Sequence, residues 1–266
     1  MINDFYLRAA DLPADTRSLV TQWIEAHPRR LQWAVRRTRQ YFGYLDHCSD
    51  LIRLAVVLAM LPDTHEKYRQ LGIEDTVFAD TMSDIGIWCA IARWQACTTV
   101  GTGSKMHLDA RLFRLGRLQF QLYRLPPVAA YPRTAPLTVG APVVYIHIPQ
   151  GAPLESEACR LSIARARAFF DRVFPDYAYT CFFSESWLLF SGNKDFMRPG
   201  CNILQFAALF HPVCDLPFPA QTMERVFGAK CRRTEDYPAE TDLQRRLKAY
   251  LLAGGQPGMG VGYIER

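Results

Sequence analysis

The spacing of apolar residues changes near residue 105, and this change constrains the fold more than any other feature of the chain. Before it, apolar residues recur every three or four positions, as Leu19 and Trp23 do, which is typical of amphipathic helices. After it, Leu118, Phe120 and Leu122 alternate with polar residues, which is typical of half-buried strands. The sequence therefore predicts a helical first half and a sheet confined to the second half.

Three stretches of the second half have strand character, 116–125, 137–148 and 179–190. Between the last two lies a predicted helix, 156–173, for which we expect Leu161, Ala164, Ala168 and Phe169 to be buried. A helix of this length most simply joins two parallel neighbouring strands by a right-handed crossover. A capping box, Thr241 with Gln244, starts another helix, and a glycine-spaced strand is predicted at the end of the chain, in 258–265.

The stretch 98–105, TTVGTGSK, is the predicted domain boundary. We therefore expect an α+β protein, with a helical N-terminal domain over 1–105 followed by a mixed α/β domain over 106–266. Within the helical half, Pro62 is expected to end a helix. Asp80 and Asp84, one helical turn apart, are expected to be exposed or capping carboxylates rather than an acid–base pair.

Composition excludes several classes of protein. The charged fraction of 21% and the hydrophobic fraction of 49% indicate an ordinary globular chain. The net charge of +5 is too dispersed to predict nucleic-acid binding, and the densest basic run, RRLQWAVRRTRQ (29–40), is expected to be the solvated face of a helix. The longest apolar run of the chain, 54–61, is too short to span a bilayer, and no signal peptide opens the sequence. We therefore expect a cytoplasmic protein with neither a nucleic-acid nor a membrane partner.

The eight cysteines are scattered and include no CxxC pair. Without paired spacing they predict free thiols, and they predict neither disulfides nor a metal site. The positions are 48, 89, 97, 159, 181, 201, 214 and 231.

The candidate site lies at the ends of the two predicted parallel strands, because ligands of open α/β sheets tend to bind there. His147 ends the first strand and is either a structural histidine or a general base, for which a side chain of pKa about 6.5 is suited. Glu185 ends the second strand and is either an exposed carboxylate or a base whose pKa its apolar neighbours raise. Its neighbours Ser184 and Ser186 place two hydroxyl groups at the same strand end.

Six segments, in this order, resemble a bacterial family of acyltransferase domain-containing proteins, whose members join a helical N-terminal domain to a C-terminal domain similar to the GNAT N-acyltransferases. The resemblance covers about residues 65–264. The segments are YRQLGIEDTVFADTMSDIGIW, RLFRLGRLQFQL, HIPQGAPLESEACRLSIARARAFF, CFFSESWLLF, NILQF and TDLQRRLKAYLLAGGQPGMGVGYI.

The resemblance implies that acyl-CoA or acetyl-CoA is the cosubstrate and that an amine, on a small molecule or a peptide, is the acceptor. In a site of this kind His147 and Glu185 are the candidate bases, and Ser186 is the third catalytic candidate, because its hydroxyl, like that of Ser184, could donate to the thioester carbonyl or the leaving thiolate. Matching the strands and the loop by order implies cofactor-binding roles for Ile148, Gln150, Gly151 and Ala152, with Ser184 on the facing strand.

The loop QGAPLE departs from the glycine spacing of the GNAT pyrophosphate loop. Glu155 and Glu157 also place negative charge at the helix end where a phosphate would bind. A second glycine-rich stretch, GQPGMG (255–260), follows a helix instead of preceding one, so it indicates a turn with close backbone contacts more than phosphate binding.

Two functions remain open from the sequence. The first is an acyl-CoA-dependent N-acyltransferase in which the amine attacks the thioester directly. The alternative is a non-catalytic ligand-binding protein that keeps the GNAT-like fold but has lost the pyrophosphate loop.

Overall fold

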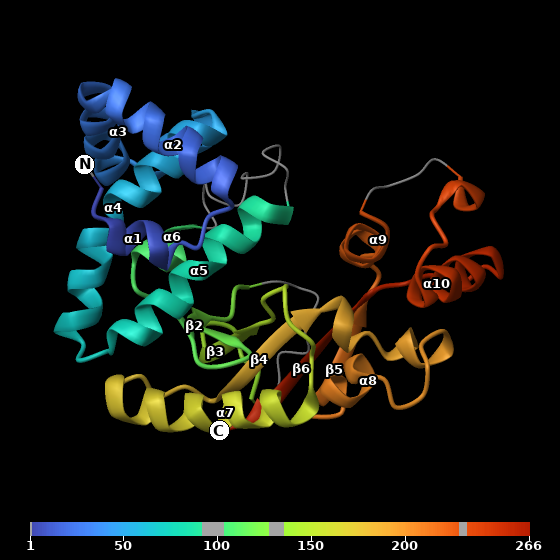
Figure 1. Cartoon of the computed structure of the whole chain (residues 1–266). Coiled ribbons are helices and arrows are strands. Elements are labelled where there is room, and N and C mark those ends of the chain that lie inside the picture. Colours follow the sequence, from blue (N-terminus) through green and yellow to red (C-terminus); the bar gives the residue numbers. More distant parts are fainter. Residues whose placement is uncertain (1, 92–103, 128–135, 229–232) are drawn as a thin grey trace. The chain divides into compact units, whose positions relative to one another are not determined.

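The computed structural model describes residues 2–91, 104–127, 136–228 and 233–266 (Figure 1). The chain divides into two compact units. The first comprises Met1–Gln121, Ile148–Ala152 and Ala168–Pro175, and the second comprises Leu122–His147, Pro153–Arg167 and Asp176–Arg266.

The first unit is mainly helical, as the apolar period predicts. Every regular element described before residue 104 is a helix, and the first strand begins at Leu112. Aromatic rings fill the interior, with Phe78 stacked on His65 and Phe113 packed against Phe169 and Phe170 of α7. The helices are α1 (Asp4–Ala9), α2 (Ala14–Ala26), α3 (Pro28–Gln40), η1 (Phe42–His47), α4 (Asp50–Gln70), α5 (Asp75–Ile91) and α6 (Lys105–Leu108).

Helix α4 does not end at Pro62, so that prediction is wrong. The helix continues through the proline to Gln70. A proline removes one backbone donor from the helix and clashes with the preceding turn, which favours a break. Here Leu58 and Leu61 before the proline and Tyr68 after it are all fully buried. Their packing offsets the local cost of the proline.

The expected exposure of Asp84 is also wrong, although Asp80 is exposed as predicted. Asp84 is only 4% exposed, and its Oδ2 atom accepts hydrogen bonds from Nε2 of His107 at 3.1 Å and from Nε1 of Trp88 at 3.1 Å. Burial alone would raise the pKa of the Asp84 carboxyl. Hydrogen bonds from His107, Trp88 and Gln119 and the charge of His107 instead hold this pKa below its ordinary value.

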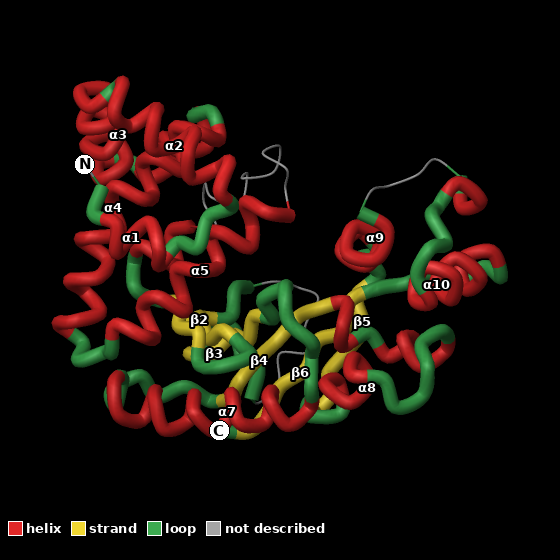
Figure 2. The backbone as a smooth tube through the Cα atoms, viewed as in Figure 1, coloured by secondary structure: helices red, strands yellow, loops and turns green. Residues whose placement is uncertain are grey.

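Within the described residues the sheet has six strands (Figure 2), in the order β1-β2-β3-β4-β6-β5, and β3 and β4 are parallel neighbours as predicted. The pairs β1–β2, β4–β6 and β5–β6 are antiparallel. The strands are β1 (Leu112–Arg114), β2 (Gln119–Arg124), β3 (Pro142–His147), β4 (Cys181–Ser186), β5 (His211–Leu216) and β6 (Met259–Glu265).

Helix α7 (Ser156–Val173) connects β3 to β4 over the range that the sequence predicts. Its predicted buried face is wrong except for Phe169, because Leu161 is 52% exposed and Ala164 and Ala168 are also exposed. The helix has two apolar stripes of similar length. The bulkier one, which includes Ile163 and Phe170, is buried instead.

Short helices lie between β4, β5 and β6 along the chain of the second unit. Phe196, Met197, Phe227, Tyr237 and Leu247 form a separate buried cluster among them. The Thr241–Gln244 capping box is confirmed. The helices are α8 (Asn202–Ala207), α9 (Ala220–Phe227), α10 (Asp242–Leu252), η4 (Trp187–Leu189), η5 (Ser191–Asp195) and η6 (Thr234–Asp236).

Strand β6 contains glycines because its backbone passes very close to neighbouring chain, as the sequence predicts. A Cβ atom on Gly258, the residue just before the strand, would lie 2.6 Å from the carbonyl oxygen of Leu216. One on Gly260 would lie 2.0 Å from the carbonyl oxygen of Leu189. Neither position can hold a side chain without moving backbone.

We expect Gly260→Ala to lower the free energy of unfolding by about 3 kcal/mol, the upper end of the usual cost of overpacking, because the new methyl group forces the backbone of η4 away from β6. Gly140→Ala is the control. Gly140 also has a special conformation, with φ of 78°, but nothing lies within 4 Å of its added Cβ, so we expect only the left-handed strain of about 1 kcal/mol. Urea denaturation measures both, and equal losses in the two variants would contradict the close approach.

Six of the eight cysteines, 48, 89, 159, 181, 201 and 214, lie in the described part, and none of these six is joined to another by a disulfide. Cys97 and Cys231 lie outside the described residues. In the part of the chain that the structure describes, no helix is both long and apolar enough to cross a membrane.

Candidate active site

Strands β3 and β4 stop pairing before they end. Their register contains Val144 opposite Phe182 and Tyr145 opposite Phe183, although both strands, described along their whole length, continue beyond these residues. Side chains bridge the strands further along. The hydroxyl of Ser184 donates to the carbonyl oxygen of Ile146 at 3.0 Å, and that of Tyr145 donates to the carbonyl oxygen of Glu185 at 3.0 Å. The parallel pair therefore opens toward its carboxyl ends.

His147 lies at the mouth of this opening. Its ring stacks on Tyr145, with the ring centroids 4.5 Å apart and the planes at 23°. When the register that pairs Tyr145 with Phe183 is continued by two residues, His147 comes opposite Glu185. The structure thus brings the two predicted catalytic groups to the same end of neighbouring strands, which is the arrangement expected from the crossover.

The protonation of the surrounding groups follows from their burial. Desolvation raises the pKa of Tyr145 to about 12, so its hydroxyl remains protonated and acts as a donor at neutral pH. Burial also raises the pKa of the half-buried Glu185 carboxyl. Desolvation is the main cause that raises the pKa of Tyr123 and of Cys214. The charge of Glu185 raises the pKa of Tyr123 further, and the charges of Asp215 and then Glu185 raise that of Cys214, so both residues lie near the Glu185 carboxylate. Sequence reasoning missed these two residues, and the absence of any prediction for β5 explains the omission of Cys214.

An apolar surface adjoins His147 and Glu185. It is formed by partly buried side chains that pack on a buried cluster containing Val143, Phe183 and Val261 of β3, β4 and β6. Half-buried aromatic and aliphatic groups of this kind bind hydrocarbon by removing its surface from water. The partly buried side chains are Tyr123, Tyr145, Val213, Cys214, Met259 and Tyr263.

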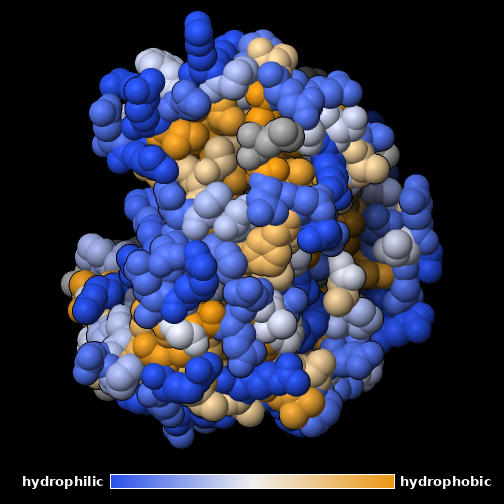
Figure 3. All heavy atoms as spheres, turned by 60° about the vertical axis from the view of Figure 1, so that its left-hand side comes forward, coloured by the Kyte–Doolittle hydropathy of each residue, from blue (hydrophilic) through white to orange (hydrophobic). Residues whose placement is uncertain are grey.

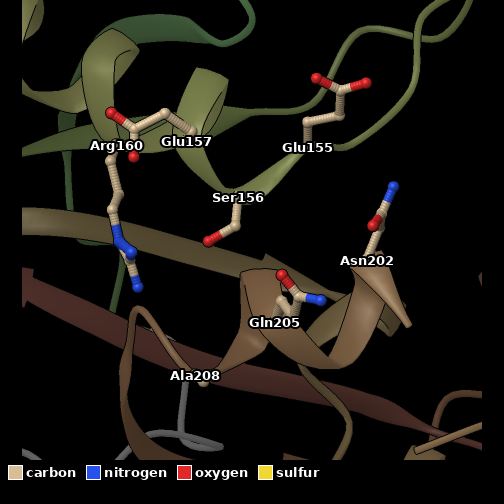
Figure 4. A pocket seen from close by; sticks show the side chains of 7 residues that line it. All are labelled: Glu155, Ser156, Glu157, Arg160, Asn202, Gln205 and Ala208. Carbon is tan, nitrogen blue, oxygen red and sulfur yellow. The ribbon is translucent and has the colours of Figure 1, made fainter. Parts of the chain in front are cut away.

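A pocket of about 540 Å³ lies at the first turn of α7 and also reaches α8 (Figure 4). In Figure 4 the side chains of Ser156 and Arg160 extend toward α8, whereas the carboxylate of Glu155 points away from it. Arg160 is the single cation among the lining residues, which include two carboxylates. The lining residues are Glu155, Ser156, Glu157, Arg160, Asn202, Gln205 and Ala208.

The loop of predicted cofactor-binding residues is fixed by one guanidinium group. Arg117 donates to the carbonyl oxygens of Pro149 at 2.8 Å and Ala152 at 2.9 Å. Gly151 between them has a φ of 92°, which a residue with a side chain rarely adopts. Ile148 and Gln150 are half-buried, and Gly151 and Ala152 are exposed.

Both serines of the predicted site have partners in the fold. Ser186 caps η4, where its hydroxyl oxygen accepts a hydrogen bond from the backbone N–H of Leu188 at 3.2 Å. Ser184 is fully buried and bonded to Ile146. The catalytic role of Ser186 and the cofactor-binding role of Ser184 stay predictions, and each hydroxyl would have to exchange its present partner to serve a ligand.

Two family models match this chain. An N-acyltransferase N-terminal domain matches residues 2–95, and a GNAT-like C-terminal domain matches residues 112–264. The chain belongs to this two-domain N-acyltransferase family. The models account for both the helical first part and the mixed sheet. No functionally curated protein matches the chain.

Solved structures with the same fold include three of acyltransferase complexes. One contains decanoyl-CoA and teicoplanin, and another contains CoA and 10C-teicoplanin; each is 24% identical, with a TM-score of 0.77. A third contains decanoyl-CoA and is 22% identical, with a TM-score of 0.78. All three comparisons cover 97% of this chain and 86% of the other. At this identity the likeness shows the fold.

Proposed function

We propose that this protein is an acyl-CoA-dependent N-acyltransferase in which the acceptor amine attacks the thioester directly. The observation that carries the proposal is the opening between β3 and β4, with His147 and Glu185 at its mouth. Membership of the N-acyltransferase family supports the reaction class. The acyl-CoA complexes of similar structures support the donor.

In the proposed step the amine nitrogen forms a bond to the thioester carbonyl carbon, and the carbon–sulfur bond then breaks. His147 takes the proton that the amine loses, which suits an imidazole at neutral pH. The CoA thiolate leaves and is protonated from the solvent or from the imidazolium. No covalent enzyme intermediate is needed, because the protein contributes a base and the relative positions of two substrates.

The apolar surface beside His147 favours an acyl chain longer than acetyl. Tyr123, Tyr145 and Tyr263 offer hydrocarbon-binding surface that an acetyl group is too short to use. Similar structures were solved with decanoyl-CoA and with the glycopeptide teicoplanin, which supports an acceptor amine on a small molecule or a peptide-like compound.

One observation favours the alternative, a non-catalytic ligand-binding protein. The pocket at the start of α7 contains Glu155 and Glu157, whose negative charges oppose a pyrophosphate at this helix end. Arg160 supplies one compensating positive charge. A CoA ester that binds here would therefore depend more on its acyl and pantetheine parts than on its phosphates.

The deciding experiment combines binding with product analysis. Isothermal titration calorimetry with acetyl-CoA, decanoyl-CoA and CoA gives the affinities, and we expect decanoyl-CoA to bind most tightly. Mass spectrometry then follows amide formation with a panel of amines that includes teicoplanin lacking its acyl chain. Tight binding without any amide or free CoA would favour the non-catalytic alternative. A protein that binds none of the three CoA compounds would contradict the proposed function.

A further inference from the structure

Helix α3 presents a cationic surface with an aromatic ring at its centre. Trp33 is 50% exposed. Arg29 and Arg30 precede it by one helical turn and Arg36 and Arg37 follow it by one turn, so all four lie beside the ring on the helix. All four arginines are exposed. We call these five residues the α3 surface.

The charges of the α3 surface are not neutralised within the described part of the chain. The helix contains no acidic residue. Among the described residues, the arginines of α3 form one ion pair, between Arg39 and Asp63, and Arg39 does not belong to the α3 surface. Four positive charges therefore face the solvent along a helix about 20 Å long. Such a concentration attracts polyanions at physiological salt.

An apolar groove runs along the edge of the α3 surface. Two adjoining cavities of about 610 and 390 Å³ share Leu31, Gln32 and Ala59, and the smaller one is also lined by Val35 and Arg36. Figure 3 shows apolar side chains, in orange, gathered in a hollow of the helical unit with blue hydrophilic residues around it. Hydrocarbon surface and cationic groups thus lie next to one another.

We propose that the α3 surface and this groove bind the anionic phospholipids of a bilayer surface. The arginines would contact lipid phosphates, Trp33 would lie at headgroup depth, and the groove would take part of an acyl chain. A nucleic acid could use the arginines and the ring, but it has no hydrocarbon chain for the groove. This proposal departs from the sequence-based expectation of no membrane partner, which rested on the absence of a spanning segment, because peripheral binding requires none.

Vesicle co-sedimentation tests the proposal on the full-length protein. The probes are phosphatidylcholine vesicles, one-to-one phosphatidylcholine–phosphatidylglycerol vesicles and a labelled DNA duplex, at the same ionic strength. We expect binding to the mixed vesicles only. Because each arginine near the surface contributes about fivefold, Arg29→Gln with Arg36→Gln should weaken this binding about 25-fold. Trp33→Ala should also weaken binding to the mixed vesicles, and its effect should be largest at high salt, where the charge contribution is screened.

The matched control removes the same charge elsewhere. Arg165 and Arg172 of α7 are exposed and, in the described part, form no ion pair, so Arg165→Gln with Arg172→Gln should leave vesicle binding within about twofold of wild type. Equal losses in the two double variants would show a non-specific charge effect and overturn the proposal. Equal binding to neutral and anionic vesicles, or duplex binding without vesicle binding, would also overturn it.

Discussion

His147→Ala is expected to lower acyl transfer by about 10²–10⁴-fold, the usual contribution of a general base. The fold should survive, because the ring is only half-buried and its stacking on Tyr145 contributes about 0.5–1.5 kcal/mol. Both quantities are measured on one preparation, as kcat/KM by mass spectrometry and as the melting temperature. Loss of rate with a small change in melting temperature supports a base.

A second histidine of the same sheet provides the control. His211 of β5 stacks on Tyr263 at a centroid distance of 5.1 Å, so it resembles His147 in its packing but lies on another strand. His211→Ala should leave the rate within about threefold of wild type. If His147→Ala instead lowers the melting temperature by several degrees and keeps near-normal turnover, the histidine is structural.

Tyr145→Phe separates positioning from proton transfer. Phenylalanine keeps the ring that stacks on His147 and removes the hydroxyl that bonds to the Glu185 carbonyl. If that bond holds the strands at their present opening, KM should rise while the pH profile of kcat keeps its shape. A shifted profile would assign the hydroxyl a part in proton transfer.

Those parts of the fold that depend on local chemistry were predictable from the sequence. The bounds of α7, the capping box at Thr241 and the parallel pairing of β3 with β4 follow from apolar period, cap residues and the length of a crossover helix. The close approach of Gly260 to neighbouring backbone was predictable, because glycine weakens a strand interior and often marks a site where another backbone comes close. These signals lie within short windows of the chain.

The parts that depend on tertiary packing were not predictable. Strand β5 contains Pro212 and is irregular between Pro212 and Cys214, which removes the two-residue alternation that would identify it. As the last strand in the sheet order it tolerates a proline, because one side of it needs no ladder donor. The buried face of α7 depends on which of two apolar stripes fits the sheet. Sequence period alone does not decide that.

The candidate site was predictable at its strand ends and not around them. The positions of His147 and Glu185 follow from the crossover. Tyr123 and Cys214 come from strands whose neighbours in the sheet the sequence does not specify. The pairing of Asp84 with His107 joins residues 23 apart, and neither has a local pattern that distinguishes it from exposed polar residues.

Asp84→Ala is expected to lower the free energy of unfolding by about 3–5 kcal/mol, as the loss of one partner in a buried pair typically does. The reason is that Nε2 of His107 and Nε1 of Trp88, which both donate to Oδ2, would lose this acceptor, and the His107 ring is buried. Asp84→Asn should recover much of the loss, since its amide oxygen can still accept both bonds. Asp80→Ala, one turn earlier on an exposed face, should change stability by less than about 0.5 kcal/mol.

The pH dependence of the same variants tests the charge. The folded pKa of Asp84 is below its ordinary value of 3.8, so the ionised carboxylate stabilises the fold above that pH. This contribution is lost as pH falls through the folded pKa. The stability difference between wild type and Asp84→Asn should therefore be constant near neutrality and shrink below about pH 4. Urea denaturation from pH 7 to pH 3 measures it. A difference that does not change with pH would show that folding does not lower the pKa of Asp84, and a wild type that gains stability on acidification would show a raised pKa; either result would contradict the assignment of a buried ion pair.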